Sequence, residues 1–254
     1  MNEDYLIDFL SQYNGFEKDY KMLPKEEIIR ALMNITMPND LSEEFYEKQD
    51  EYLQNLLSRF ALEDARKLEY DHQICLWKGD ITKIKADAIV NACNEQMLGC
   101  FIPMHKCIDN AIHSFAGLQV RRDMMRIMAE QGHPEPNGQV KVTKGYNLPA
   151  KYIFHTVGPV TNGAPTKENV DDLSHCYLSC LKQADEMGLK NIVFCSIATG
   201  VYAFPIESAS LLALQTTMLY LKTTKSRLRV VFDLFSDKDF ETYQKTWKQL
   251  LSSK

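Results

Sequence analysis

Residues 88–94 read Ala-Ile-Val-Asn-Ala-Cys-Asn, a short apolar run that carries two asparagines at its end. A run of this kind is typical of a strand buried on both faces, and asparagines after a strand commonly shape a turn. The same arrangement returns at 192–205, where Ile-Val-Phe-Cys is followed by Ser-Ile-Ala-Thr-Gly-Val-Tyr-Ala-Phe-Pro. Both polar segments are therefore predicted to lie at the carboxyl ends of strands, where open α/β sheets bind ligands.

Strands and helices alternate on both sides of these segments from about residue 71 onward. Further apolar runs predict strands at 74–77, 140–142, 152–157 and 229–232. Patterns with helical spacing predict helices at 112–132, 171–188, 208–221 and 240–251. This order favours an α/β fold whose sheet is covered by helices on both faces.

Residues 1–70 have helical patterns and no chemical motif. Pro24 suits the first turn of a helix, and Ser42 can cap another helix, with Glu43 and Glu44 in its first turn. The change of periodicity near residue 71 sets the predicted boundary. We expect a helical extension at 1–70, packed as a cap on a main domain at 71–254.

Composition and charge exclude several classes of protein. The 254 residues are 45% hydrophobic and carry a net charge of −5, without a basic run, which argues against general nucleic-acid binding. No apolar run is long enough for a transmembrane helix, and the acidic N-terminus does not resemble a signal peptide. The chain has seven cysteines, an odd number, and in a cytosolic chain they should be reduced, so no disulfide framework is expected. We expect a cytoplasmic protein without membrane contact, and a monomer, because no heptad pattern is long enough to require a partner.

A short loop carries three candidate metal ligands, Cys100, His105 and Cys107. Thiolates and imidazole are the ligands that zinc prefers, and three of them would leave a fourth position for water or substrate. Pro103 makes a helix improbable here, so a loop that wraps an ion is expected. Two alternatives stay open: loop thiols that bind no metal, and a structural zinc that only fixes the loop.

Four segments, in this order and spacing, resemble the macrodomain family. They are residues 79–82 (Gly-Asp-Ile-Thr), 90–94, 108–113 (Ile-Asp-Asn-Ala-Ile-His) and 196–205. The resemblance covers about residues 72–251. It implies a three-layer α/β/α fold with a mixed central sheet that binds ADP-ribose.

The resemblance also implies a role for each matching residue. Asp80 would accept a hydrogen bond from the adenine amino group, and the backbone of Ile81 would lie along the same base. Asn94 and Asp109 would contact the distal ribose. The pyrophosphate would be wrapped by Ser196, Thr199, Gly200, Val201 and Tyr202, since a glycine-containing loop lets backbone N–H groups approach phosphates. Phe235, after the last strand, could pack on the adenine.

The loop with Cys100, His105 and Cys107 departs from the glycine-rich run of many macrodomains. It is similar to a zinc-containing subgroup, whose pattern is close to GCFxPxHxCIDNxIH. This similarity implies Zn²⁺ as cofactor and hydrolysis of mono-ADP-ribose from a modified protein side chain, with a carboxylate linkage expected. It also implies two partners, a lipoylated carrier protein and a sirtuin-type ADP-ribosyltransferase.

Asn94 and Asp109 are the expected catalytic residues, with Asn94 holding the ribose hydroxyls and Asp109 positioning or deprotonating a water molecule. Two other functions stay open: a reader module that binds ADP-ribose and cuts nothing, and an O-acetyl-ADP-ribose deacetylase. We interpret His113 as a packing or capping residue and His155 as a core residue with satisfied hydrogen bonds. Asn91 is expected to hold the turn that aims Asn94.

Overall fold

The computed structural model describes residues 2–16, 23–39 and 41–252 of the chain. Six strands form the main sheet: β2 (Ile74–Trp77), β4 (Ala88–Cys93), β5 (Val140–Lys144), β6 (Tyr152–Val157), β7 (Asn191–Phe194) and β8 (Arg229–Asp233). Their order is β2-β8-β7-β4-β6-β5, and every neighbouring pair is parallel except β5 with β6. Two short strands, β1 (Glu63–Asp64) and β3 (Ile84–Lys85), pair separately.

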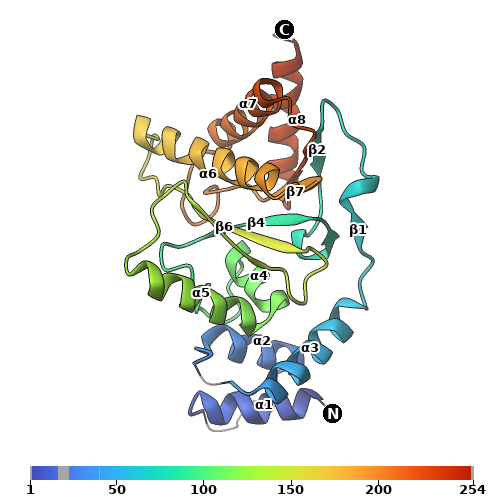
Figure 1. Ribbon diagram of the computed structural model, residues 1–254, viewed down its shortest axis with the longest axis vertical. Helices are drawn as coiled ribbons and strands as arrows, with labels where there is room; N and C mark the ends of the chain where they lie inside the picture. The colour runs from blue at the N-terminus through green and yellow to red at the C-terminus, as the bar shows by residue number, and fades with distance from the viewer. Residues whose placement is uncertain (1, 17–22, 40, 253–254) are drawn as a thin grey trace.

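Helices cover both faces of the main sheet. On one face lie α4 (Ile108–Ala116) and α5 (Leu118–Gln131), and on the other α6 (Lys167–Glu186), α7 (Ile206–Thr224) and α8 (Asp237–Ser252) (Figure 1). The central strand β7 is buried along its whole length, which explains its uninterrupted apolar sequence. The predicted three-layer α/β/α fold with a mixed sheet is confirmed.

The first three helices, α1 (Asn2–Tyr13), α2 (Lys25–Ile35) and α3 (Glu43–Leu57), form a cluster beside α4 and α5 (Figure 1). Their buried residues, such as Leu6 and Phe45, make an apolar core of their own, to which Leu118 of α5 contributes. The Ser42 cap is confirmed, because its side chain accepts a hydrogen bond from the Phe45 N–H at 3.2 Å. Ala65 already belongs to the larger core of the α/β layers. The division of the chain at residue 71 stays a prediction.

The single helix predicted at 112–132 is wrong, because Gly117 separates α4 from α5. Gly117 has φ +99° and ψ 170°, a conformation that only glycine adopts readily. A Cβ atom there would meet the Gln49 amide nitrogen at 2.6 Å and the Gln119 side-chain oxygen at 2.7 Å. The Gln49 side chain also accepts a hydrogen bond from the Leu118 N–H at 2.8 Å. A residue of α3 therefore fixes the break between α4 and α5.

Three later helices begin two to four residues earlier than their apolar patterns predicted. Thr166 and Asn169 form a capping box at the start of α6, and Pro205 precedes α7. Ser236 accepts a hydrogen bond from the Asp239 N–H at 3.0 Å at the start of α8. The first turns of α6 and α8 are polar and carry no apolar spacing, so the periodicity detects these helices only after their caps.

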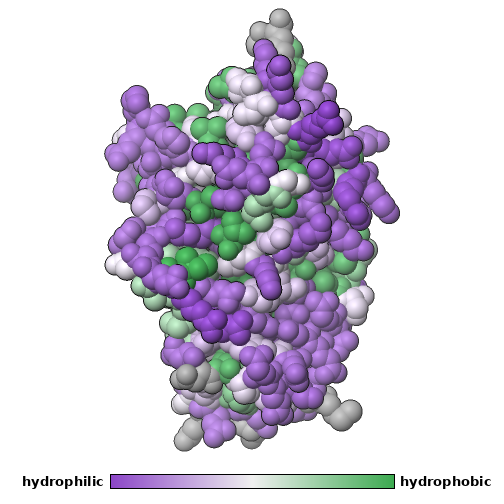
Figure 2. Space-filling view, viewed as in Figure 1, coloured by the Kyte–Doolittle hydropathy of each residue, from purple (hydrophilic) through white to green (hydrophobic). Residues whose placement is uncertain are grey.

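The surface and one connecting segment complete the description of the fold. The face in Figure 2 is largely hydrophilic, with apolar residues scattered over it. Across residues 2–16, 23–39 and 41–252, no helix is both long and apolar enough to span a bilayer.

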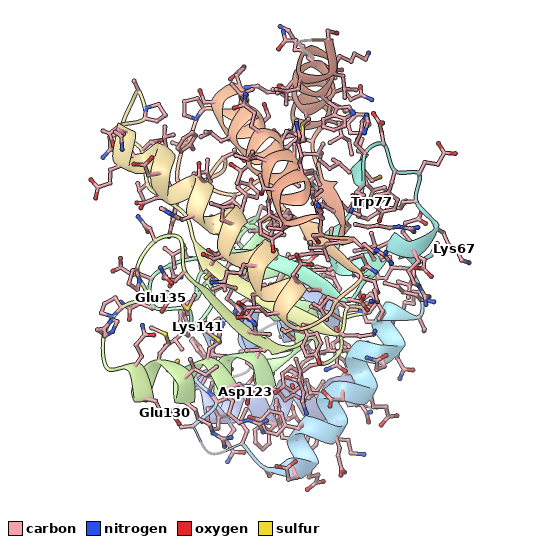
Figure 3. All side chains as sticks on the ribbon, turned by 45° about the horizontal axis from the view of Figure 1, so that its top comes forward. Lys67, Trp77, Asp123, Glu130, Glu135 and Lys141 are labelled. Atoms are coloured by element: carbon pink, nitrogen blue, oxygen red, sulfur yellow. The ribbon has the colours of Figure 1, made fainter. Side chains whose placement is uncertain are left out.

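Glu135 and Lys141, neighbours in Figure 3, form an ion pair at 3.3 Å between the segment after α5 and strand β5. The Glu135 N–H also donates to the Glu95 carbonyl, which fixes the segment that follows β4.

We predict that Gly117→Ala lowers the free energy of unfolding by about 2–4 kcal/mol, because the backbone strain and the contact with Gln49 add together. Gly132→Ala is the matched control: its φ is +75°, but a Cβ atom there would meet nothing within 4 Å. The control should lose only about 1 kcal/mol. Urea denaturation of both variants measures the difference, and equal losses would contradict the contact argument.

Candidate functional site

A cleft of about 460 Å³ opens at the carboxyl ends of the central strands. Strands β4 and β7 pair only at Ala88–Ile89 with Ile192–Val193, so their chains separate beyond these residues. Each of four strands then contributes to the cleft wall: Asn94 follows β4, Gly158 follows β6, Ser196 follows β7, and Asp233 ends β8. The predicted location of the polar segments is thus confirmed.

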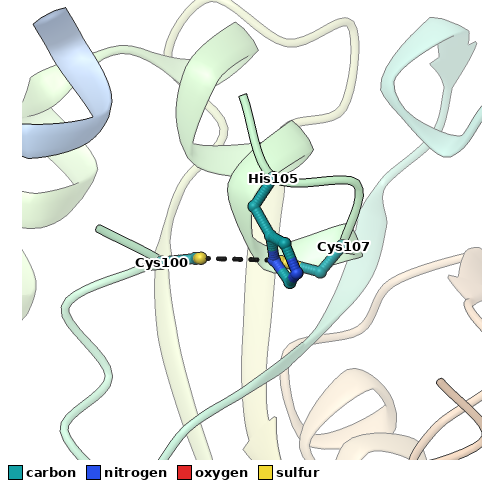
Figure 4. A group of neighbouring side chains, drawn as sticks. All are labelled: Cys100, His105 and Cys107. Carbon is teal, nitrogen blue, oxygen red and sulfur yellow. Dashed lines mark hydrogen bonds between the residues drawn. The ribbon is translucent and has the colours of Figure 1, made fainter. Parts of the chain in front are cut away.

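The candidate metal ligands Cys100, His105 and Cys107 come together on one side of this cleft (Figure 4). The sulfur of Cys100 lies 3.5 Å from His105 Nδ1, and the three potential ligand atoms all lie within 4.8 Å of one another. All three side chains are partly exposed. Two thiols and one imidazole in this arrangement could hold a metal ion.

Asp109, in the first turn of α4, lies next to this group and lines the cleft. Its carboxylate is almost fully buried and accepts a hydrogen bond from the Asn91 side chain at 2.8 Å. Burial raises the pKa of Asp109 to about 6, while the Asn91 hydrogen bond and the charge of Arg121 act in the opposite direction. The structure therefore holds a single carboxylate in fixed orientation beside the candidate metal ligands.

Asn91 does not hold the turn that aims Asn94, and this prediction is wrong. The Asn91 amide donates to Asp109 at 2.8 Å and lies 3.2 Å from His155 Nδ1. Asn94 shapes its own turn: its oxygen accepts from the Gln96 N–H at 3.0 Å, and its amide donates to the Gly99 carbonyl at 3.2 Å.

Two buried histidines lie behind Asp109. His155 contacts Asn91 and the Thr143 hydroxyl, the latter at 2.9 Å, so its prediction as a satisfied core residue is confirmed. Burial lowers the pKa of His155 to about 3, which keeps the ring neutral. His113 lies outside the candidate metal group and packs edge-on against His155, with ring centroids 6.0 Å apart. A side chain at Gly99, where φ is +85°, would meet the His113 ring at 2.9 Å.

The segment 196–205 forms one wall of the cleft, and the five predicted phosphate-loop residues all line it. The loop is closed by the Phe204 N–H, which donates to the Ala198 carbonyl at 2.9 Å, and Phe204 anchors it in the core. Ala198 has φ +64°, a conformation rare outside glycine. Among the described residues, the N–H groups of Gly200 and Val201 have no backbone acceptor. These groups are available to bind an anion.

Asp80 and Ile81 do not line the cleft. Asp80 caps a short 3₁₀ helix, Ile81–Lys83, by accepting a hydrogen bond from the Thr82 N–H at 2.9 Å, and Ile81 is buried. Both residues follow β2, which pairs with β8. Asp233, at the end of β8, lines the cleft. Burial, and after it the charge of Asp80, raises the pKa of Asp233 well above its usual range.

Asp233 was missed in the sequence, although a signal is present there. An acidic residue ends the apolar run of β8, and the structure buries it with one carboxyl oxygen that has no hydrogen-bond partner among the described residues. Phe235, two residues later, lines the same end of the cleft and is 76% exposed. This end therefore combines a buried carboxyl group with an exposed aromatic ring.

We predict a rapid class of two thiols, Cys100 and Cys107, when the native, chelator-treated protein reacts with an aromatic disulfide reagent. Cys107 should be the slower of the two, because burial raises the pKa of its thiol to about 11. The other five cysteines are buried and should react only after unfolding. Cys107→Ala should reduce the rapid class to one thiol. Counting released chromophore against time measures this, and three or more rapid thiols in the wild type would contradict the arrangement of the loop.

Comparisons with known proteins identify the family. Residues 90–213 match the family model of the Macro domain. The chain is 44% identical over 254 residues to a protein named protein-ADP-ribose hydrolase from Staphylococcus aureus, covering 97% of this chain and 95% of that protein. A solved Oceanobacillus iheyensis macrodomain with ADP shares 36% identity and a TM-score of 0.65, covering 70% of this chain and 92% of that one. A Trypanosoma brucei macrodomain structure shares 29% identity and a TM-score of 0.65, over 90% of this chain and 94% of that one. The chain belongs to the Macro domain family.

Proposed function

We propose that this protein is a hydrolase that removes mono-ADP-ribose from modified protein side chains. The observation that carries the proposal is the placement of Asp109 and the Cys100–His105–Cys107 group on one wall of the cleft. A module that only binds ADP-ribose needs neither a buried carboxylate nor a ligand cluster at that position. The S. aureus relative, named protein-ADP-ribose hydrolase and similar over nearly the whole chain, supports the same activity.

We propose a single orientation for ADP-ribose in the cleft. In this proposal the pyrophosphate binds the free N–H groups at Gly200 and Val201, along the loop that includes Ser196, Thr199 and Tyr202. The adenine lies toward Phe235 and extends past the residues that line the cleft to reach Asp80 and Ile81, and the distal ribose lies toward Asn94 and Asp109. The O. iheyensis neighbour, whose structure contains ADP, supports nucleotide binding in this fold.

The metal in this proposal is zinc, held by Cys100, His105 and Cys107. The donor set fits, because two thiolates and one imidazole match the preference of zinc and leave one position open. Bound zinc would orient a hydroxyl of the distal ribose, and two thiolates would make it a weaker activator of water than a site with three histidines. We place the enzyme in the cytoplasm, where a reducing environment keeps these thiols available.

The protein's own residues perform the hydrolytic step. Asn94 holds the ribose hydroxyls, since its amide keeps one N–H and one lone pair free beyond its bonds to Gly99 and Gln96. Asp109, fixed by Asn91, orients a water molecule toward the distal C1 atom and accepts its proton. The bond from C1 to the side-chain oxygen breaks, and the carboxylate leaves with its electron pair. A carboxylate is a stable leaving group, so little acid assistance is needed.

The resemblance noted in the sequence extends the proposal to partners. The substrate would be a lipoylated carrier protein, modified by a sirtuin-type ADP-ribosyltransferase, and this protein would act as a monomer. Nucleic acid is not expected as a partner, in line with the acidic net charge of −5.

We predict one zinc ion per chain by elemental analysis, and release of ADP-ribose from a protein modified on carboxylates. Cys107→Ala should lose zinc and slow release by about 100-fold or more. It should still bind ADP-ribose, because the phosphate loop is closed by its own hydrogen bond from the Phe204 N–H to the Ala198 carbonyl. Cys75→Ala, a thiol on β2 outside the cleft, is the matched control and should behave as the wild type.

Three outcomes would replace parts of the proposal. Tight binding of ADP-ribose without cleavage would establish a reader module. Cleavage of O-acetyl-ADP-ribose alone would establish a deacetylase. A wild-type chain without metal would remove zinc from the proposal and leave the cleft and Asp109.

We predict that Asp80→Asn weakens ADP-ribose binding about tenfold or more, because an amide nitrogen would face the adenine amino group in place of an oxygen acceptor. The substitution keeps an oxygen for the Thr82 N–H, so the cap of the short helix survives. Zinc content should not change. Isothermal titration with ADP-ribose measures the effect, and a dissociation constant within twofold of the wild type would show that the adenine lies elsewhere.

A further inference from the structure

The loop with the candidate metal ligands is connected directly to helix α2. Asn34, in the last turn of α2, is 1% exposed. Its side-chain oxygen accepts a hydrogen bond from the Met104 N–H at 3.0 Å, and its amide donates to the Ser114 hydroxyl at 2.9 Å. One amide side chain of the N-terminal helices thus joins the residue before His105 to helix α4.

Met104 needs such a contact because of its backbone conformation. Its φ is +57°, in the left-handed region, which costs a residue other than glycine or asparagine roughly 1 kcal/mol. Among the described residues, Asn34 is the only acceptor for the Met104 N–H. The turn at Met104 lies between Cys100 and the pair His105 and Cys107, so its direction decides whether the three ligands can meet.

We propose that Asn34 is a positioning residue of the loop at 98–107, called the metal loop here. Asn34 holds Met104 in the left-handed conformation that brings His105 and Cys107 to Cys100. The proposal rests on the metal site proposed above and adds to it a role for the N-terminal helices. In this role α2 is a structural part of the site, although none of its residues lines the cleft.

Two arginines fix the position of α2 relative to the same loop. Arg121 of α5 donates from Nη1 to the carbonyl groups of Met33, Asn34 and Thr36, at the C-terminal end of α2, and from Nε to the Leu98 carbonyl at 2.6 Å. Its guanidinium group also lies over the Phe101 ring, 4.3 Å from the centroid. The buried guanidinium thus holds the backbone around Asn34 against the start of the metal loop.

The second arginine works through Asn110. Arg30 of α2 donates to the Asn110 side-chain oxygen at 2.9 Å, and the Asn110 amide donates to the Ile102 carbonyl at 3.0 Å. The Asn110 N–H lies 3.4 Å from the Cys107 sulfur. Through Asn110, helix α2 is therefore connected to Ile102 and Cys107, on both sides of Met104, and Asn34 contacts Met104 directly.

The test compares Asn34→Leu with Ser114→Ala in the full chain. Leucine keeps the branched shape of the side chain but offers no acceptor to Met104, whereas Ser114→Ala removes the other partner of Asn34 and leaves the Met104 contact in place. Zinc affinity is measured by competition with a chromophoric chelator. We expect Asn34→Leu to weaken zinc binding about 10–100-fold, as for other residues that orient metal ligands. Ser114→Ala should stay within about threefold of the wild type.

Near-ultraviolet circular dichroism of each metal-free variant, and its affinity for ADP-ribose, separate loop effects from loss of the fold. A folded Asn34→Leu chain with weakened zinc binding and unchanged ADP-ribose affinity supports the proposal. Equal zinc affinity in Asn34→Leu and wild type overturns it and leaves the metal site standing. An Asn34→Leu chain that is unfolded before zinc is added also overturns it, because Asn34 would then hold the fold. A wild type that binds no zinc overturns both.

Discussion

The separation of β4 from β7 is the constraint on which the rest of the site depends. Parallel strands that stayed paired to their ends would leave no space between them, but these two share only two residue pairs. Their connections then leave toward opposite faces of the sheet, to α4 on one side and α7 on the other. The loop with Cys100, His105 and Cys107 belongs to the first connection and the segment 196–205 to the second, so one topological feature places both walls of the cleft.

Buried polar groups set the chemistry at the floor of this cleft. A carboxylate removed from water is costly unless hydrogen bonds stabilise it, and Asp109 receives one from Asn91. Asn91 is held in turn beside His155, which Thr143 contacts from the antiparallel strand β5. The orientation of one catalytic candidate thus depends on a chain of polar contacts across three strands, β4, β6 and β5. Such a chain keeps the carboxylate in place before substrate arrives.

The sequence predicted features that depend on neighbouring residues, and it missed features that depend on residues far away in the chain. Apolar strands, the Ser42 cap and the spacing of Cys100, His105 and Cys107 are local features, and the structure contains them all. The break at Gly117 depends on Gln49, far away in the chain. The helical spacing of the neighbouring residues therefore predicted one continuous helix. Asn91 was misinterpreted for the same reason, because its partner Asp109 lies on a helix whose position only the fold determines. Asp233 was missed because an acidic residue at the end of an apolar run points to a site only when that residue is known to be buried.

Arg121 has a consequence for how the chain folds. Its guanidinium group is 1% exposed and binds carbonyl groups 85 to 88 residues earlier in the sequence. During synthesis the first three helices therefore leave the ribosome long before the residue that fixes the end of α2 has been made. Contacts over such a sequence separation form late, since loop-closure entropy opposes them. Until then the amphipathic N-terminal helices expose apolar surface, which favours aggregation. The loop with Cys100, His105 and Cys107, which α2 holds in place, reaches its final shape only after α5 has docked.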